Sequence, residues 1–95
     1  MKLIFGELAK RDLRWFAAYY SKTFPEGRKN AERRLTVAIE LLLANPYAGT
    51  IVEGKPARQF PVLRTPFIVI YSIEGDSIHI TRVWDARADP VRLNE

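Results

Sequence analysis

The chain has 95 residues, 47% of them hydrophobic, and a formal net charge of +4. This length is typical of one domain, and we expect a single domain over residues 1–95. The absence of cysteine and the presence of only one histidine exclude disulfide scaffolds, cysteine nucleophiles and thiolate or histidine-rich metal sites. We therefore expect no metal and no cofactor. No apolar run approaches the ~20 residues needed to cross a bilayer, and the N-terminus lacks the apolar stretch of a secretory signal, so we expect a cytoplasmic protein with no membrane partner.

The positive charge is concentrated in the first part of the chain. Residues 1–57 contain ten Lys or Arg against six acids, whereas residues 58–95 contain five of each sign. This distribution favours an acidic protein partner that docks on the N-terminal part, and we expect no direct nucleic-acid binding. The alternative is a solvated helix face that is basic for solubility.

A strand and two amphipathic helices are predicted before residue 45. The strand covers Lys2–Gly6, and the first helix runs from Glu7 to Ser21. Its apolar stripe, with helical spacing, consists of Leu13, Phe16, Ala17 and Tyr20. Trp15 and Tyr19 form a second aromatic pair on its flank. We interpret this pair as core beneath a neighbouring helix, with a partner-facing patch as the alternative.

The second helix is predicted from Arg28 to Ala44. Pro25 and Gly27 separate it from the first helix, and Asn45-Pro46 ends it, because the residue before proline is disfavoured in the α region. Its apolar positions are Ala31, Leu35, Ala38, Ile39, Leu42 and Leu43. The two helices joined by a short connection form an αα-hairpin.

Strand patterns begin after a predicted loop at residues 46–56. Strands are expected at Arg58–Leu63, at Phe67–Ile73 and at Ser77–Trp84, with a tight turn at residues 74–76. The middle strand is apolar on both faces, which is typical of a central strand. The alternation near residues 82–84 is ambiguous and allows a bulge there. The predicted fold class is α+β with the order β-α-α-β-β-β, a helical hairpin packed on a mainly antiparallel sheet.

Short motifs in a fixed order then suggest a family. They are Asp12-Leu13 and Tyr20 in the first helix, Leu41-Leu42-Leu43-Ala44-Asn45-Pro46 followed by Gly49, Gly54 and Arg58, Thr65-Pro66-Phe67-Ile68-Val69-Ile70-Tyr71, Glu74-Gly75-Asp76, and Ile78-His79-Ile80-Thr81-Arg82-Val83-Trp84. No single motif is specific, but their order and spacing cover nearly the whole chain. In this respect the chain resembles the ParE/RelE superfamily of bacterial toxins, and the resemblance implies a toxin of a type II toxin–antitoxin system.

The superfamily has two main branches, which differ in chemistry. RelE-like members are ribosome-dependent mRNA endonucleases, whereas ParE-like members poison DNA gyrase without being enzymes. RNA cleavage needs groups that remove and donate a proton, with cations around the phosphate. Here no lysine follows Lys55, Ile68 stands where RelE-like members tend to carry arginine, and no Tyr or His follows the last strand. The residues of this chain therefore favour the ParE-like branch over the RelE-like branch. Membership of that branch implies that the chain has no catalytic residue and that DNA gyrase is its target.

Two further side chains that can move a proton, Tyr71 and His79, are assigned structural roles. We expect Tyr71 to be a core residue whose hydroxyl is satisfied. His79 lies in mid-strand without a partner in the sequence, and we expect it to be structural as well. Asp85 stands where many ParE-like chains have a histidine, so no role is transferred to it.

Arginines in the second half form the predicted target-binding surface. Arginine is a poor general base, but it binds carboxylates or phosphates through two parallel hydrogen bonds. The predicted target-binding residues are Arg58, Arg64, Arg82, Trp84 and Arg87. In this prediction Trp84 is an exposed contact, with a core cap at the strand end as the alternative. The alternative is that Arg58 and Arg82 form intramolecular pairs with Asp85, Asp76 or Glu74.

The resemblance also implies a cognate antitoxin. Its acidic or amphipathic tail, disordered when free, would wrap the helical hairpin, with addition to a sheet edge as a further possibility. The basic side chains of the helices agree with this expectation. The predicted antitoxin-binding residues are Arg11, Arg14, Trp15, Arg33 and Arg34.

Three functions remain open at this point. The first is a gyrase-directed toxin that is not an enzyme. The second is a ribosome-dependent endonuclease with unusual residues. The third is a non-toxic binding module of the same fold, which Asp85 and the neutral second half of the chain favour.

Overall fold

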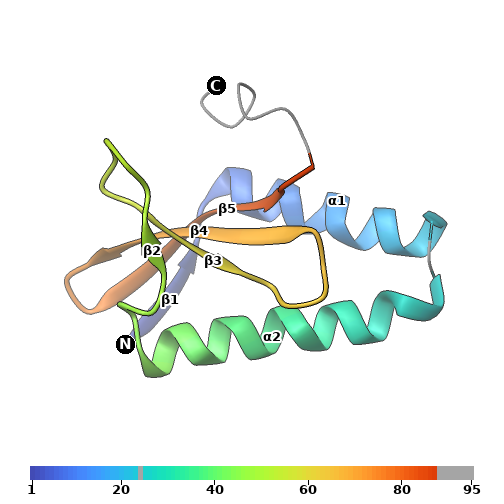
Figure 1. Ribbon diagram of the computed structural model, residues 1–95, viewed down its shortest axis with the longest axis horizontal. Coiled ribbons are helices and arrows are strands. Elements are labelled where there is room, and N and C mark those ends of the chain that lie inside the picture. Colours follow the sequence, from blue (N-terminus) through green and yellow to red (C-terminus); the bar gives the residue numbers. More distant parts are fainter. Residues whose placement is uncertain (24, 88–95) are drawn as a thin grey trace.

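The computed structural model describes residues 1–23 and 25–87 (Figure 1). Along the chain the elements are β1 (Lys2–Phe5), α1 (Glu7–Thr23), the 3-10 turn η1 (Pro25–Gly27), α2 (Arg28–Ala44), β2 (Thr50–Ile51), β3 (Arg58–Pro61), β4 (Phe67–Glu74) and β5 (Ser77–Asp85). The predicted α+β class is confirmed: a helical hairpin packs on a mostly antiparallel sheet. The bounds of α2 agree with the prediction, and α1 extends two residues beyond the predicted Ser21.

The five strands form one sheet in the order β1-β5-β4-β3-β2. The pairs β5–β4, β4–β3 and β3–β2 are antiparallel, whereas β1 lies parallel to β5 and pairs from Lys2 opposite Ser77 to Phe5 opposite Ile80. The two-helix crossover between β1 and the rest of the sheet allows this parallel pairing. The central position of β4, predicted from its apolar character on both faces, is confirmed.

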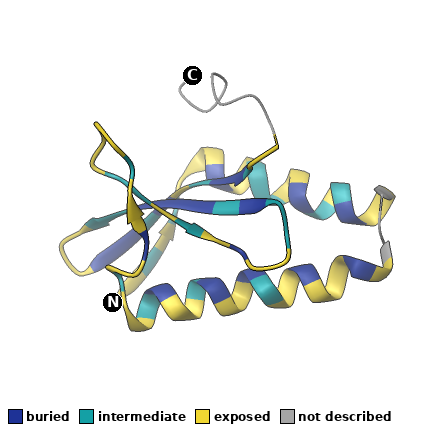
Figure 2. Ribbon diagram, in the orientation of Figure 1, coloured by how far each residue is buried: buried dark blue, intermediate teal, exposed yellow. Residues whose placement is uncertain are grey.

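Both helices bury one side against the same face of the sheet. Figure 2 shows buried positions recurring along α1 and α2 between exposed ones, as expected for helices with one apolar stripe. The core contains Ala9, Phe16 and Tyr20 from α1, Ala31, Leu35, Ala38 and Leu42 from α2, and Val69, Tyr71, Ile78, Ile80 and Val83 from β4 and β5. Phe67 packs at the end of this core, 4.6 Å from Phe16 between ring centroids.

Tyr71 ties the loop after α2 to the sheet. Its side chain is fully buried, its hydroxyl donates to the Pro46 carbonyl at 2.7 Å, and it accepts from the Gly49 N–H at 2.9 Å. A Cβ atom at Gly49 would lie 2.5 Å from this hydroxyl, so the close approach requires glycine. The prediction of a core tyrosine with a satisfied hydroxyl is confirmed.

Two predictions for the segment between α2 and β4 are wrong, whereas the other strand ends differ from the prediction by one residue at most. Residues 46–56 are not all loop, because Thr50 and Ile51 form β2 and pair with β3. The strand predicted to end at Leu63 ends at Pro61, where the chain turns: the Val62 N–H donates to the Phe67 carbonyl at 3.0 Å. Val62 is nevertheless buried, so its apolar character reflects the core and not a longer strand.

The bulge lies at Thr81, one residue before the segment where the sequence allowed it. Ile70 lies opposite Arg82 and Tyr71 opposite Ile80, which leaves Thr81 without an opposing residue. The Thr81 hydroxyl donates to the Ile70 carbonyl at 3.0 Å. The extra residue changes the face to which the following side chains point, which explains the ambiguous alternation after Ile80.

Candidate functional site

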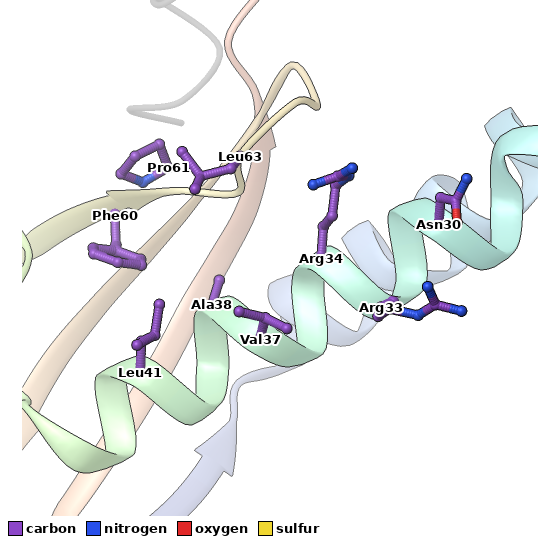
Figure 3. Close-up of a pocket in the computed structure, with 9 residues that line it drawn as sticks. All are labelled: Asn30, Arg33, Arg34, Val37, Ala38, Leu41, Phe60, Pro61 and Leu63. Atoms are coloured by element: carbon purple, nitrogen blue, oxygen red, sulfur yellow. The ribbon is translucent and has the colours of Figure 1, made fainter.

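The first candidate surface is a groove of about 340 Å³ between α2 and β3, called here the α2–β3 groove. Its lining consists of Asn30, Arg33, Arg34, Val37, Ala38, Leu41, Phe60, Pro61 and Leu63. Figure 3 shows Leu41 and Phe60 projecting toward each other across it. Val37, Leu41 and Leu63 are between 46% and 66% exposed. An apolar surface with this shape is typical of a groove that receives an amphipathic segment.

Two predicted antitoxin-binding arginines stand beside this apolar lining. In Figure 3 the side chain of Arg34 extends toward the turn that carries Leu63, and that of Arg33 points away along the helix. Within the described residues neither has a carboxylate partner, whereas Arg28, at the start of the same helix, donates to Glu32 at 2.9 Å. The α2–β3 groove is therefore apolar along its floor and positively charged at one end.

The second candidate surface lies between α1 and the end of β5, and we call it the α1–β5 groove. It has a volume of about 470 Å³, and its lining consists of Arg11, Asp12, Trp15, Arg82, Val83, Trp84 and Asp85. Arg11 and Trp15 were predicted to contact an antitoxin, and Arg82 and Trp84 to contact a target. The fold thus brings residues from both predicted sets into one groove.

Asp12 holds the two walls of the α1–β5 groove together. Its carboxylate accepts from Nε of Arg82 at 2.7 Å, from Nη2 of Arg82 at 3.1 Å and from the Val83 N–H at 3.0 Å. The β1–β5 register ends at Ile80, so the Asp12 carboxylate supplies a partner where β1 no longer does. Arg82 is paired, as the alternative interpretation foresaw, but with Asp12 and not with Asp85, Asp76 or Glu74.

The expected exposure of Trp84 is wrong, because only 9% of it is exposed. The guanidinium carbon of Arg82 lies 4.7 Å from the centroid of its indole ring, and the ion pair to Asp12 fixes the guanidinium in this position. The exposed tryptophan of this groove is instead Trp15, half of whose surface is accessible. Trp15 stacks on Tyr19 with 5.4 Å between ring centroids and meets the edge of Phe67.

Arg87 lies two residues after the end of β5, where Asp85 holds it in a clamp of hydrogen bonds beside the same groove. Its backbone N–H and its Nε donate to Oδ1 of Asp85 at 2.9 and 3.0 Å, and Nη2 donates to Oδ2 at 2.9 Å. These hydrogen bonds lower the pKa of Asp85 below its usual range. The guanidinium also lies 5.2 Å from the Tyr19 ring centroid. The last described residue is therefore held against α1.

The other predicted arginines lie apart from these grooves. Arg58 donates to the carbonyls of Gly49 and Tyr47, at 2.8 and 3.4 Å, and lies over the Tyr47 ring. Arg64 is exposed in the turn between β3 and β4, with a φ of 61°. Arg14 is exposed on α1 and lines neither groove. The structure therefore does not gather the predicted target-binding set into one surface.

Asp12 and the apolar lining of the α2–β3 groove were not among the predicted site residues. Val37 and Leu41 are four residues apart and lie off the buried stripe of α2, and this spacing marks an exposed apolar strip. Nothing in the sequence near Asp12 indicates a partner on the last strand.

The side chains on the sheet that can move a proton have structural partners. The Tyr71 hydroxyl is used by Pro46 and Gly49, and Nε2 of His79 lies 2.9 Å from a Glu74 carboxylate oxygen. Within residues 1–23 and 25–87 no three acidic or histidine side chains converge as metal ligands would. None of the helices in that part of the chain is both long and apolar enough to cross a bilayer.

Comparison with known proteins identifies the family. A sequence model described as the ParE toxin of the type II toxin–antitoxin system parDE matches residues 3–90. The chain belongs to the ParE toxin family. A solved structure described as the chromosomal ParDE toxin–antitoxin system from P. aeruginosa is 27% identical in sequence, with a TM-score of 0.71 over 87% of this chain and 92% of that one. A search of curated protein sequences gave no match.

Proposed function

We propose that this ParE family member acts by binding DNA gyrase and that it performs no chemistry itself. The choice of gyrase follows from the family resemblance, and the observation that favours an action without chemistry is the engagement of Tyr71 and His79 in internal contacts. A general base or acid must be free to reach its substrate. The carboxylates at the ends of β4 and β5 are engaged as well, Glu74 with His79 and Asp85 with Arg87. Arginines such as Arg64 and Arg87 supply charge for binding but not a proton acceptor.

We further propose that an antitoxin neutralises the protein by placing an amphipathic, acidic segment in the α2–β3 groove. The exposed side chains of Val37, Leu41 and Leu63 offer apolar contact, and Arg33 and Arg34 offer partners for carboxylates at one end. An antitoxin partner fits the family and the ParDE system that the chain resembles. The place of action is the cytoplasm, where DNA gyrase works.

The test is a supercoiling assay with purified gyrase. Addition of the purified protein is expected to inhibit supercoiling and to accumulate cleaved DNA, and preincubation with the antitoxin is expected to restore activity. In growing cells, induction is expected to cause filamentation and a DNA-damage response. Cleavage of messenger RNA in the ribosomal A site, with gyrase unaffected, would instead establish the endonuclease function. Harmless expression without either effect would establish a non-toxic binding module.

A further inference from the structure

β4 extends beyond β3 at one end of the sheet, and a pocket lies beside its last residues. β3 begins at Arg58, which lies opposite Tyr71, whereas β4 continues to Glu74. The pocket has a volume of about 350 Å³, and we call it the overhang pocket. Sites for small molecules have volumes of about 300–1,000 Å³. Its lining includes Tyr47, Ile51, Lys55, Arg58, Ser72 and Ile73.

The loop between β2 and β3 forms one wall of this pocket and is fixed by its own hydrogen bonds. The Val52 N–H donates to the Ala57 carbonyl at 2.9 Å, and the Lys55 N–H donates to the Val52 carbonyl at 3.1 Å. Gly54 supplies the positive φ, 77°, at the tip of this turn. The wall is therefore formed before a ligand arrives, which lowers the entropy cost of binding.

The charge of the overhang pocket is positive. Lys55 and Arg58 belong to its lining, and no Asp or Glu is among the described residues that line it. Arg58 donates to the carbonyls of Gly49 and Tyr47 through Nη1 alone, so its Nε and Nη2 have no partner in the described part of the chain. Two adjacent guanidinium nitrogens bind a phosphate or carboxylate through parallel hydrogen bonds. The pocket therefore favours an anion.

Tyr47 provides a flat apolar surface next to this charge. It is 66% exposed, and the guanidinium carbon of Arg58 lies 5.1 Å from its ring centroid. Ile51, which is also exposed, belongs to the same lining. Exposed aromatic rings beside cations are the surfaces on which proteins stack nucleobases. A bare phosphate leaves this surface unused, whereas an uncharged ring covers Arg58 without pairing its charge.

We propose that the overhang pocket binds a nucleoside monophosphate, with the base stacked on Tyr47 and the phosphate held by Arg58. Charge and shape together select this occupant, because the cations require an anionic group and the exposed ring requires a flat one. The Ser72 side chain, which lines the pocket, offers a hydroxyl to the sugar. This binding involves neither the antitoxin nor gyrase, so it is a property separate from the function proposed above.

The experiment titrates the full-length protein with adenosine monophosphate and follows its backbone amide signals by NMR at physiological salt. Saturable changes are expected at Tyr47, Ile51 and Ser72. Adenosine and inorganic phosphate, which each lack one half of the ligand, are expected to bind at least about tenfold more weakly. Equal binding of either one, changes that do not saturate, or changes confined to other parts of the protein would overturn the proposal.

Two variants at one position test the base contact. Tyr47→Ala is expected to weaken binding of adenosine monophosphate at least about fivefold, whereas Tyr47→Phe, which keeps the ring, stays within about twofold of the unaltered protein. Both variants are expected to fold, as measured by circular dichroism, because the carbonyl of Tyr47 and not its ring accepts the hydrogen bond from Arg58. Equal affinities of the two variants would contradict the stacking assignment.

A single strand of six adenine nucleotides identifies the source of the nucleotide. A free nucleotide fills the overhang pocket by itself, so the strand is expected to bind no more than about threefold more tightly than adenosine monophosphate. A strand that binds more than about tenfold more tightly, with a steep dependence on salt, would overturn the assignment to a free nucleotide.

Discussion

Asp12 of α1 and Arg82 of β5 are 70 residues apart in sequence and form a two-point ion pair, with 2.7 and 3.1 Å between the nitrogen and oxygen atoms. Each side chain is less than 15% exposed (13% for Arg82 and 14% for Asp12). The pair fixes the first helix against the last strand, and the same carboxylate satisfies the N–H of Val83. It is thus a long-range connection between the two ends of the described chain.

Asp12→Ala is expected to lower the free energy of unfolding by about 3 kcal/mol, because it leaves a poorly solvated guanidinium and an N–H without partners. Urea denaturation measures the change. Glu7→Ala is the control: Glu7 pairs with Lys10 at 3.4 Å and is 92% exposed, so its loss is expected to stay below about 0.5 kcal/mol. Similar values for the two variants would show that the Asp12 pair contributes no more than an exposed one.

Gly49→Ala is expected to destabilise the protein by about 1–3 kcal/mol, because the new Cβ would lie 2.5 Å from the Tyr71 hydroxyl and 2.9 Å from the Gln59 carbonyl. Gly6→Ala is the matched change, since its nearest neighbour, the Ile80 carbonyl, lies at an ordinary 3.5 Å. A loss of less than about 0.5 kcal/mol is expected there. Thermal unfolding of the two variants measures the difference in their stability. The prediction fails if Gly49→Ala is as stable as Gly6→Ala.

Val37→Asn is expected to reduce antitoxin affinity at least about tenfold while changing stability by less than about 0.5 kcal/mol, because Val37 is 46% exposed in the α2–β3 groove. Thr36→Asn is the control at the adjacent position, which is exposed but outside the groove. Binding is measured by calorimetry and stability by urea denaturation. Equal affinity for the two variants would place the antitoxin elsewhere.

The Asp85–Arg87 clamp is expected to persist in acid. Because the Arg87 hydrogen bonds lower the folded-state pKa of Asp85 from the ordinary 3.8, the clamp contributes fully above that pH and is lost only as the pH falls through the lowered value. Carboxyl NMR titration measures the midpoint. Arg87→Met is expected to raise the midpoint toward or above the ordinary value, since burial of the carboxylate then acts without its hydrogen-bond partner. An unchanged midpoint would contradict the assigned cause.

The helices and most strands could be predicted because their signals are local. The predicted and observed bounds of α2 coincide, since its apolar spacing, Gly27 before it and Asn45-Pro46 after it act within one or two turns. β2 was missed because two exposed residues, Thr50 and Ile51, cannot show a period. The turn after Pro61 was missed because Val62 has the apolar character of a strand residue but lies in the core.

The candidate site was less predictable, because its contacts join distant segments. The sequence marked Arg11, Trp15, Arg33 and Arg34 as residues of basic helices with an aromatic flank, and these residues do line grooves. It could not show that Arg82 would meet Asp12, nor that this pair would leave Trp84 buried and Trp15 exposed. Burial at the end of β5 depends on how α1 crosses it, and strand alternation contains no information about that crossing.

The parallel pairing of β1 with β5 has a consequence for biosynthesis. Among the described strands, the first to be synthesised pairs with the last, from Lys2 opposite Ser77 to Phe5 opposite Ile80. A growing chain therefore carries β1 without its sheet partner until residues 77–80 have been synthesised, and closing this large loop makes folding depend on contacts of large sequence separation. Premature termination before Ser77 deprives the sheet of two strands, because β1 loses its only neighbour in the sheet of the described residues.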